Sequence, residues 1–159
     1  MAAESARLCE IRLAALAGDP DAFTSTLAHE AGLPEAWWDD WAALSEDGGE
    51  QRTFLLTDSS DASLGLALVR SDEPGSRSAV INAMWVAPEA RGRDGAGVLC
   101  DACAAWAKEH GFPELMLDVV VGNDPALRAY AAAGFAIRGE TTWSRHGRTL
   151  HEYVMARPL

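Results

Sequence analysis

The chain is poor in basic residues, with 13 lysines and arginines against 24 aspartates and glutamates in 159 residues, and its formal net charge is −11. An excess of negative charge repels the phosphate backbone, so the composition disfavours nucleic-acid binding. No apolar run approaches the roughly eighteen residues that a membrane helix needs. Glu10 and Arg12 interrupt the apolar segment from 8 to 17, unlike the core of a signal peptide. We therefore expect a cytoplasmic protein with no membrane partner.

Cysteine is also scarce, and the three cysteines are an odd number that argues against a disulfide framework. Cys100 and Cys103 are spaced as a Cys-x-x-Cys, but no second pair and no spaced histidine pair completes a zinc site. The four histidines are scattered along the chain. We expect these cysteines to pack in a core and the protein to bind no metal.

What the sequence does contain is the alternation of helix and strand signals of one mixed α/β domain over residues 1–159, with 48% apolar residues to form its core. Proline and glycine mark most of the boundaries, and the first strands read as an antiparallel meander. The periodicity predicts helices over 3–17, 19–31, from 34 onward, 95–110 and from 124 to the glycine at 134, and strands over 53–57, 63–70, 78–86, 114–121, 135–142 and 149–156.

A glycine-containing loop, Arg91-Gly-Arg-Asp-Gly-Ala-Gly97, lies between the strand that ends near 86 and the helix that follows. A turn of this kind leaves the first backbone N–H groups of the helix unpaired and available to an anion. Gly92, Gly95 and Gly97 permit close approach of a ligand, and Arg91 and Arg93 add positive charge. The loop therefore favours a ligand with phosphates, such as a nucleotide or coenzyme A, over an ordinary strand-to-helix turn.

The same segment resembles the coenzyme A loop of the GNAT acetyltransferase superfamily, which reads Arg or Gln, two residues, Gly, one residue, and Gly or Ala. That pattern falls on Arg91, Asp94 and Ala96. The resemblance continues through Val98-Leu99, Trp106-Ala107, His110-Gly-Phe112, Leu115 to Val119 and Asn123 to Phe135. It implies a mixed, mostly antiparallel twisted sheet of about six to seven strands flanked by helices. It also implies acetyl-CoA as co-substrate, an acetyl-CoA-binding core over 80–135 and a helical acceptor-side region over 1–50.

One residue departs from the family pattern, because Asp94 stands where the family has its first glycine. A carboxylate there would repel the phosphates. Either the loop slides by one residue, so that Gly95 and Gly97 do the work and Asp94 points to solvent, or the affinity for the cofactor is weakened. We favour the slide, since Arg91 and Arg93 would also offset a single acid.

The resemblance also assigns roles in direct transfer, in which the amine attacks the thioester, a base takes its proton and an acid protonates the thiolate. Tyr130, seven residues after Asn123, matches the family's general acid, although it could be a core aromatic. Asn123 matches the asparagine that binds the pantetheine arm or a water, although Asn-Asp-Pro also starts helices. The expected cofactor contacts are Met84, Trp85, Val86, Arg91, Gly92, Arg93, Asp94, Gly95, Ala96, Gly97, Asn123 and Tyr130.

A candidate base is Asp118, which lies five residues before Asn123, where the family branch that acetylates protein N-termini carries a catalytic glutamate. Strand alternation places Asp118 on one face with Met116 and Val120. An acid with a raised pKa that works through water is one interpretation. A solvated or salt-bridged aspartate is the other.

Acidic residues are concentrated in the first third, where residues 1–50 hold 11 acids and 2 bases. The resemblance places this region over the acceptor cleft, which suggests a cationic amine, although the acids could equally form a solvated surface. Trp37, Trp38 and Trp41 lie beside Asp39 and Asp40, and aromatic rings with carboxylates can bind an alkylammonium group. The other interpretation is a helix packed by its tryptophans.

These features together predict an N-acetyltransferase that moves the acetyl group of acetyl-CoA to a small cationic amine, such as a polyamine, an aminoglycoside or a basic peptide antibiotic. A protein N-terminal acetyltransferase and a non-catalytic acyl-CoA-binding sensor are the alternatives. Residues 1–7 do not supply the strand with which family members usually begin. A sheet edge without it needs a loop or a partner subunit, so a homodimer is possible.

Overall fold

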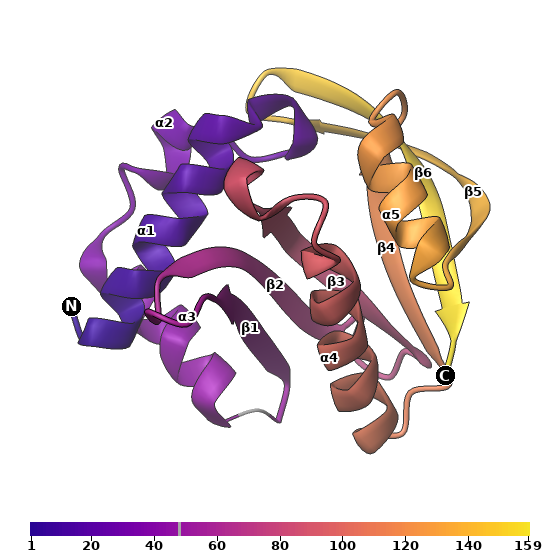
Figure 1. Cartoon of the computed structure of the whole chain (residues 1–159), viewed down its shortest axis with the longest axis horizontal. Coiled ribbons are helices and arrows are strands. Elements are labelled where there is room, and N and C mark those ends of the chain that lie inside the picture. The colour runs from indigo at the N-terminus through magenta and orange to yellow at the C-terminus, as the bar shows by residue number, and fades with distance from the viewer. Residues whose placement is uncertain (48) are drawn as a thin grey trace.

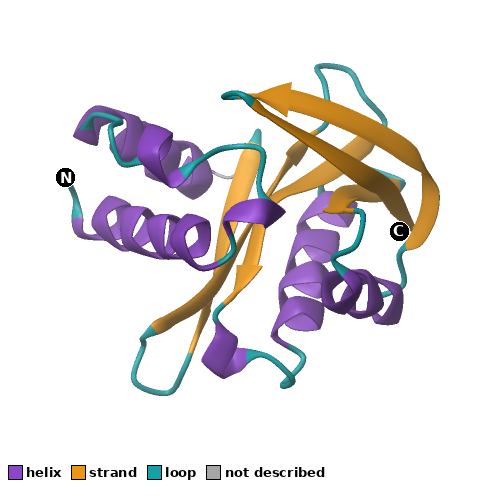
Figure 2. Cartoon of the chain, turned by 90° about the horizontal axis from the view of Figure 1, so that it is seen from above, coloured by secondary structure: helices purple, strands orange, loops and turns teal. Residues whose placement is uncertain are grey.

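The computed structural model describes residues 1–47 and 49–159 and arranges them as one sheet between two layers of helices (Figures 1 and 2). The helices are α1 (Ala3–Gly18), α2 (Leu27–Glu30), α3 (Glu35–Asp47), α4 (Gly95–Glu109) and α5 (Asp124–Ala132), with short 3-10 turns at Pro20–Ala22 and Pro88–Ala90. The strands are β1 (Gln51–Thr57), β2 (Ser63–Ser71), β3 (Ser78–Val86), β4 (Glu114–Val120), β5 (Ala136–Arg145) and β6 (Arg148–Pro158).

The strand order is β1-β2-β3-β4-β6-β5, and every neighbouring pair is antiparallel except β3 and β4. The predicted mixed, mostly antiparallel sheet flanked by helices is thus confirmed. Figure 2 shows α1 and α3 on one face of the sheet and α4 and α5 on the other. We call these the α1 face and the α4 face.

Alternation along β4 shows which side chains belong to each face. Leu115, Leu117 and Val119 are buried in a cluster with α4, where Cys100 and Cys103 also pack. A separate cluster fills the α1 face and contains Leu8, Ile11, Leu16, Trp38, Trp41, Leu66 and Trp85. Burial of both faces is what the apolar periodicity of the strands and of α4 requires.

The helix predicted over 19–31 is wrong. Pro20–Ala22 forms only a 3-10 turn, Phe23 is extended, and α2 begins afresh after Thr26. The Thr26 side chain accepts a hydrogen bond from the backbone N–H of His29, as an N-cap does. The run Thr24-Ser-Thr26 explains the break, since hydroxyl side chains compete for backbone hydrogen bonds and favour caps over helix interiors.

The parallel strands β3 and β4 separate part of the way along. Their last pair is Ile81 with Leu117, after which β3 turns at Ala83, a non-glycine residue with φ of 55°. The left-handed conformation costs a residue with a Cβ about 1 kcal/mol. β4 keeps its pairing with β6 through Val120, so a gap opens in the sheet beyond Ile81 and Leu117.

Candidate active site

A cavity of about 520 Å³ opens on the α4 face beside this gap. Its walls are the end of β3, the loop before α4 and the first turns of α5. We call it the loop cavity. It is lined by every residue that the sequence predicted to contact the cofactor, except Arg93 and Gly97. The structure therefore brings together predicted residues that lie up to 46 positions apart, from Met84 to Tyr130.

The loop presents the N-terminus of α4 to this cavity. The residue at the N-cap position, Asp94, makes no side-chain hydrogen bond that caps the helix within the described chain. The first N–H groups of α4 are therefore available to an anion. Gly95 is needed for packing, because a Cβ there would lie 2.8 Å from Leu56 Cδ2 and 3.3 Å from Val86 Cγ1. These features fit the diphosphate of a coenzyme A molecule.

Asp94 takes the backbone conformation that the family's first glycine would have at this position of the loop. Its backbone is left-handed, with φ of 60° and ψ of 23°, a conformation that favours glycine and that aspartate tolerates better than most residues. Its carboxylate folds against Gly97 in the first turn of α4, where a Cβ would overlap it. Asp94 is exposed and Gly95 lines the cavity, as the predicted slide of the loop requires, but Gly97 does not line it and Asp94 does.

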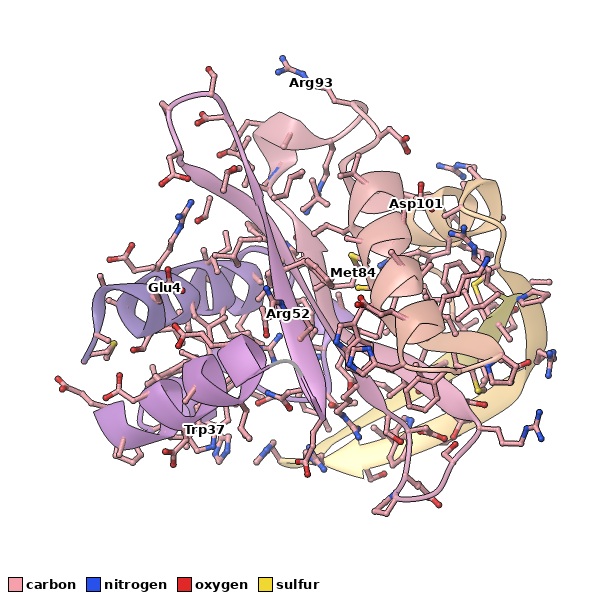
Figure 3. All side chains as sticks on the ribbon, turned by 90° about the horizontal axis from the view of Figure 1, so that it is seen from below. Glu4, Trp37, Arg52, Met84, Arg93 and Asp101 are labelled. Atoms are coloured by element: carbon pink, nitrogen blue, oxygen red, sulfur yellow. The ribbon has the colours of Figure 1, made fainter. Side chains whose placement is uncertain are left out.

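The two arginines of the loop have different surroundings. Arg91 donates from Nε to the Val86 carbonyl at 3.0 Å and from Nη2 to the Asp19 carboxylate. The same Asp19 oxygen accepts a hydrogen bond from Trp85 Nε1 at 2.7 Å. Arg93 extends from the loop into solvent (Figure 3). Asp19 lines the cavity, and sequence reasoning missed it because it lies 72 residues from Arg91.

Tyr130 lies on α5 and reaches the loop cavity from within the core, with only 8% of its surface exposed. Burial raises the pKa of its hydroxyl above the ordinary value, and Cys100 adds a smaller effect in the same direction. The hydroxyl therefore stays protonated and can donate a proton. Asn123 lines the same cavity, and its Oδ1 also caps α5 by accepting from the Ala126 N–H at 3.4 Å.

A second cavity, also of about 520 Å³, lies on the α1 face between the first helices and β2–β3. We call it the helical cavity. Asn82 and Ala83 of β3 line it, whereas the next residues, Met84 to Val86, line the loop cavity. The helical cavity thus lies on the α1 face, whereas the loop cavity also has walls from that layer, since Asp19 and Ala22 line it. The two cavities adjoin along β3, where Asn82 and Ala83 line one and Met84 lines the other.

The turn between β5 and β6 closes one side of the helical cavity. The ring of His146 lies on that of His29, with centroids 4.1 Å apart. Arg148 Nη1 donates to the carbonyls of Pro20 at 2.7 Å and Phe23 at 3.1 Å. The turn and the segment before α2 are therefore held together across the cavity.

The helical cavity is not the acidic cleft that the charge distribution suggested. Among the described residues that line it, Glu30 is the one carboxylate, and it forms a buried ion pair with Arg12 at 2.6 Å. Arg70 and Arg145 line the cavity as well. Most acids of the first third face solvent, because a count of charges along the chain does not say to which side each points.

The three tryptophans of α3 divide between the core and the helical cavity, so their role in binding a cation stays a prediction. Trp38 is 2% exposed and stacks on Trp41 in the core, where Trp41 Nε1 donates to Thr53 Oγ1 at 3.0 Å. Trp37 and Trp41 line the helical cavity, and Trp37 is the exposed member (Figure 3). Asp39 accepts from Ser5 and Ala2 at the start of α1 instead.

Asp118 lies on the α1 face, where the gap begins. It follows Leu117, the last residue of β4 paired with β3, and its neighbours Leu117 and Val119 point to the α4 face. Burial raises the pKa of Asp118, the Trp143 side chain opposes that shift by hydrogen bonding, and Asp72 adds to it. Asp118 is thus on the opposite face of the sheet from Tyr130, with the gap between them.

Glu152 of β6 is a second carboxylate on this face, and sequence reasoning missed it. It pairs with Val120 of β4, two positions beyond Asp118 on the same side of the strand. Burial raises its pKa to about 7, and repulsion from Asp118 contributes less. Its signal in the sequence is weak, because one glutamate in a strand of mixed polarity gives no indication that it is buried.

The sequence of the chain matches the Acetyltransferase (GNAT) family over residues 17–135. It is 35% identical over 112 residues to streptothricin acetyltransferase from Streptomyces lavendulae, and the match covers 67% of this chain and 59% of that protein. The chain thus spans less than two thirds of this curated relative.

Solved structures show the same fold. The crystal structure of nourseothricin acetyltransferase superposes with a TM-score of 0.61 and 26% identity, over 69% of this chain and 65% of that one. A phosphinothricin acetyltransferase from Sinorhizobium meliloti in complex with AcCoA superposes with a TM-score of 0.79, over 100% of this chain and 85% of that one. At 21% identity the latter supports the fold alone.

The described residues contain neither a helix suited to a membrane nor a cluster suited to a metal. None of the helices has both the length and the apolar character that crossing a membrane requires. In the same residues, no group of three or more histidine, cysteine, aspartate or glutamate side chains is placed to hold a metal ion.

Proposed function

The chain belongs to the GNAT acetyltransferase family, and on that basis we propose that it transfers the acetyl group of acetyl-CoA to a primary amine. One observation carries the proposal: the loop cavity combines the free N-terminus of α4 with the buried, protonated Tyr130. The first feature suits phosphates and the second suits a leaving thiolate. The gap beside the cavity gives access from the other face of the sheet.

In this proposal the first turn of α4 binds the diphosphate, and the backbone of Met84 to Val86 pairs with the pantetheine arm. The thioester then lies in the gap between β3 and β4. The amine attacks it from the α1 face, a carboxylate on that face, Asp118, takes the amine's proton, and Tyr130 protonates the departing sulfur. Arg91, Gly92, Asp94, Gly95, Ala96 and Asn123 complete the walls around the cofactor.

For the acceptor we propose a small cationic amine, of the polyamine, aminoglycoside or basic peptide antibiotic kind. The name of the relative, streptothricin acetyltransferase, supports an antibiotic amine. The carboxyl groups of Asp118 and Glu152, on the α1 face beyond the last β3–β4 pair, support a cation more directly than the helical cavity does, because the Glu30 carboxylate there is already paired with Arg12. We place the reaction in the cytoplasm, where acetyl-CoA is available, and a homodimer stays a prediction.

Titration calorimetry with acetyl-CoA and free coenzyme A tests the cofactor site. Thiol release in the same samples, with a panel of polyamines, aminoglycosides and basic peptides, tests the reaction and identifies the acceptor class. Micromolar binding with amine-dependent release is expected. If neither acetyl-CoA nor coenzyme A bound, the proposed cofactor site would be contradicted. If thiol were released only with a peptide N-terminus as acceptor, an N-terminal acetyltransferase would be favoured.

An acyl-CoA sensor without turnover is a second candidate, and the Asp94 carboxylate in the loop cavity favours it. A sensor binds the cofactor and releases no thiol with any amine. Its binding would not depend on a proton donor, so Tyr130→Phe would leave every measured property unchanged. An enzyme would lose turnover in the same variant.

A further inference from the structure

We propose that Glu152 is the proton acceptor of the reaction and acts through Asp118, so that the two carboxylates work as a pair on the α1 face. Asp118 meets the amine at the gap, and Glu152 takes up the proton that the amine loses. This inference rests on the proposed function and adds to it a residue that neither the sequence motifs nor the loop cavity indicates.

The sheet register brings the two carboxylates together. Asp118 pairs with Val154 across the antiparallel β4–β6 ladder, and Val120 pairs with Glu152. Asp118 and Glu152 are therefore diagonal neighbours on one face, with backbones about 7 Å apart and side chains within reach of each other. Both lie beyond Leu117, where β4 has no pairing with β3.

The surroundings of Glu152 are unusual for a structural glutamate. Only 6% of the residue is exposed, and within the described chain its carboxylate has no hydrogen bond and no ion pair. A buried charge without a partner is costly, so a carboxylate kept only for structure would normally have one. The Glu152 oxygens still touch solvent. Among the described residues, Arg12 Nη1 is the side-chain polar atom that is both fully buried and without a hydrogen-bond partner, and the Glu152 oxygens are not in that class. The Glu152 carboxyl group therefore keeps a small contact with solvent through which a proton can leave.

The groups around Glu152 favour its protonated form. Asp118 on β4 repels the charge, and Thr141 on β5 pairs opposite Glu152 and carries none. On β6 the nearest side chains of the same face, Leu150 and Val154, are apolar. Asp72 repels Asp118 in turn, and only the neutral Trp143 side chain acts in the opposite sense on Asp118. Two like charges in such a place hold a shared proton near neutral pH.

The proton balance of the transfer is then complete. A protonated amine first loses one proton to solvent, because only the neutral amine has the lone pair that attacks. As the C–N bond forms and the C–S bond breaks, the nitrogen loses a second proton, which passes to Asp118 and on to Glu152. The sulfur takes one proton from Tyr130. Solvent removes the proton from Glu152 and restores that of Tyr130, so that no charge accumulates in the site.

Glu152→Gln tests the inference, and Glu140→Gln is its matched control on the neighbouring strand, at an exposed position paired with Tyr153. The measurements are kcat and kcat/KM from pH 5.5 to 9 with saturating acetyl-CoA, together with acetyl-CoA binding and thermal unfolding. For the wild type we expect activity to fall below about pH 7 as the pair takes up its proton.

In Glu152→Gln we expect kcat at pH 8 to drop about 100-fold, while acetyl-CoA binding and folding persist. The fall in activity below about pH 7, which is the acidic limb of the pH–rate profile, should flatten. Glu140→Gln should keep both the rate and the limb. A Glu152→Gln protein with the wild-type rate and limb would overturn the inference alone. Wild-type protein that binds acetyl-CoA but turns over no amine would instead overturn the proposed function.

Discussion

The carboxylate of Asp19, at the end of α1, binds the guanidinium of Arg91 in the loop before α4. Arg91 is the first residue of the coenzyme A pattern, so an acid from the acceptor-side helices already engages a cation that the phosphates would use. Trp85 Nε1 donates to the same oxygen of Asp19. Under the proposed function, the cofactor would compete with Asp19 for Arg91 or share that arginine with it.

Asp19→Asn is expected to tighten acetyl-CoA binding by about threefold, because the amide leaves Arg91 free but can still accept from Trp85. Titration calorimetry measures the effect. Asp21→Asn removes an exposed acid two residues away and should change nothing. Weaker binding in Asp19→Asn would show that the acid positions Arg91 instead of competing for it.

At Asp94, replacement by asparagine or glycine should strengthen coenzyme A binding by about fivefold, since either change removes a negative charge from the phosphate site. Both residues tolerate the left-handed backbone found there, so the loop should keep its shape. The gain should shrink at high salt if it is electrostatic. Equal affinities for all three proteins would mean that the carboxylate turns away when the cofactor binds.

Tyr130→Phe should lower kcat about 100-fold at unchanged acetyl-CoA affinity, because the variant keeps the ring and loses only the proton donor. Tyr153→Phe alters the other tyrosine of the chain and serves as the control. The rates come from thiol release at saturating amine. Equal loss in both variants would point to a general packing defect.

The raised pKa of Glu152 predicts a dependence of stability on pH. An unfolded glutamate releases its proton near pH 4.5, whereas the folded one holds it to about 7. The folded state therefore binds more protons in this window, and its stability falls as the pH rises through it. Glu152→Gln should be more stable than the wild type by about 3 kcal/mol at pH 8 and nearly equal to it at pH 4.5. Urea denaturation at the two pH values measures this, and Glu140→Gln should show no such difference.

Trp38→Ala should destabilise the fold by about 3–5 kcal/mol, because it empties a fully packed site in the α1-face core. Trp37→Ala, one residue away, should cost less than about 1 kcal/mol and should instead raise the KM for the amine, since Trp37 lines the helical cavity. Chemical denaturation and steady-state kinetics separate the two effects. A similar loss of stability in both variants would contradict the assignment of Trp38 to the core and of Trp37 to the helical cavity.

Most of the fold could be predicted from the sequence because its signals are local. The strand predicted over 78–86 coincides with β3, and α4 differs from its prediction by one residue at the end. The loop, Asn123 and Tyr130 were predicted from their resemblance to the family pattern, which is also local in the sequence, and they line one cavity. The hydroxyl-rich break before α2 shows where local propensity was misread.

The rest of the site depends on contacts that no local pattern encodes. Asp19 reaches Arg91 across 72 positions, and Glu152 reaches Asp118 through the β4–β6 register. The excess of acidic residues in the first third can be read from the sequence. The direction in which each acidic side chain points depends on how α1 and α3 pack on the sheet. Similarly, Trp38 and Trp37 differ by one position and face different environments.

The turn at Ala83 allows one strand, β3, to line two different binding cavities. Because Asn82 lines the helical cavity and Met84 lines the loop cavity, under the proposed function amine and acetyl-CoA would enter through separate cavities and neither would block the other's exit. Both orders of substrate addition and product departure are then open. An inhibitor lodged between α1 and β2 would compete with the amine and leave the affinity for acetyl-CoA unchanged, so the two halves of the reaction could be targeted separately.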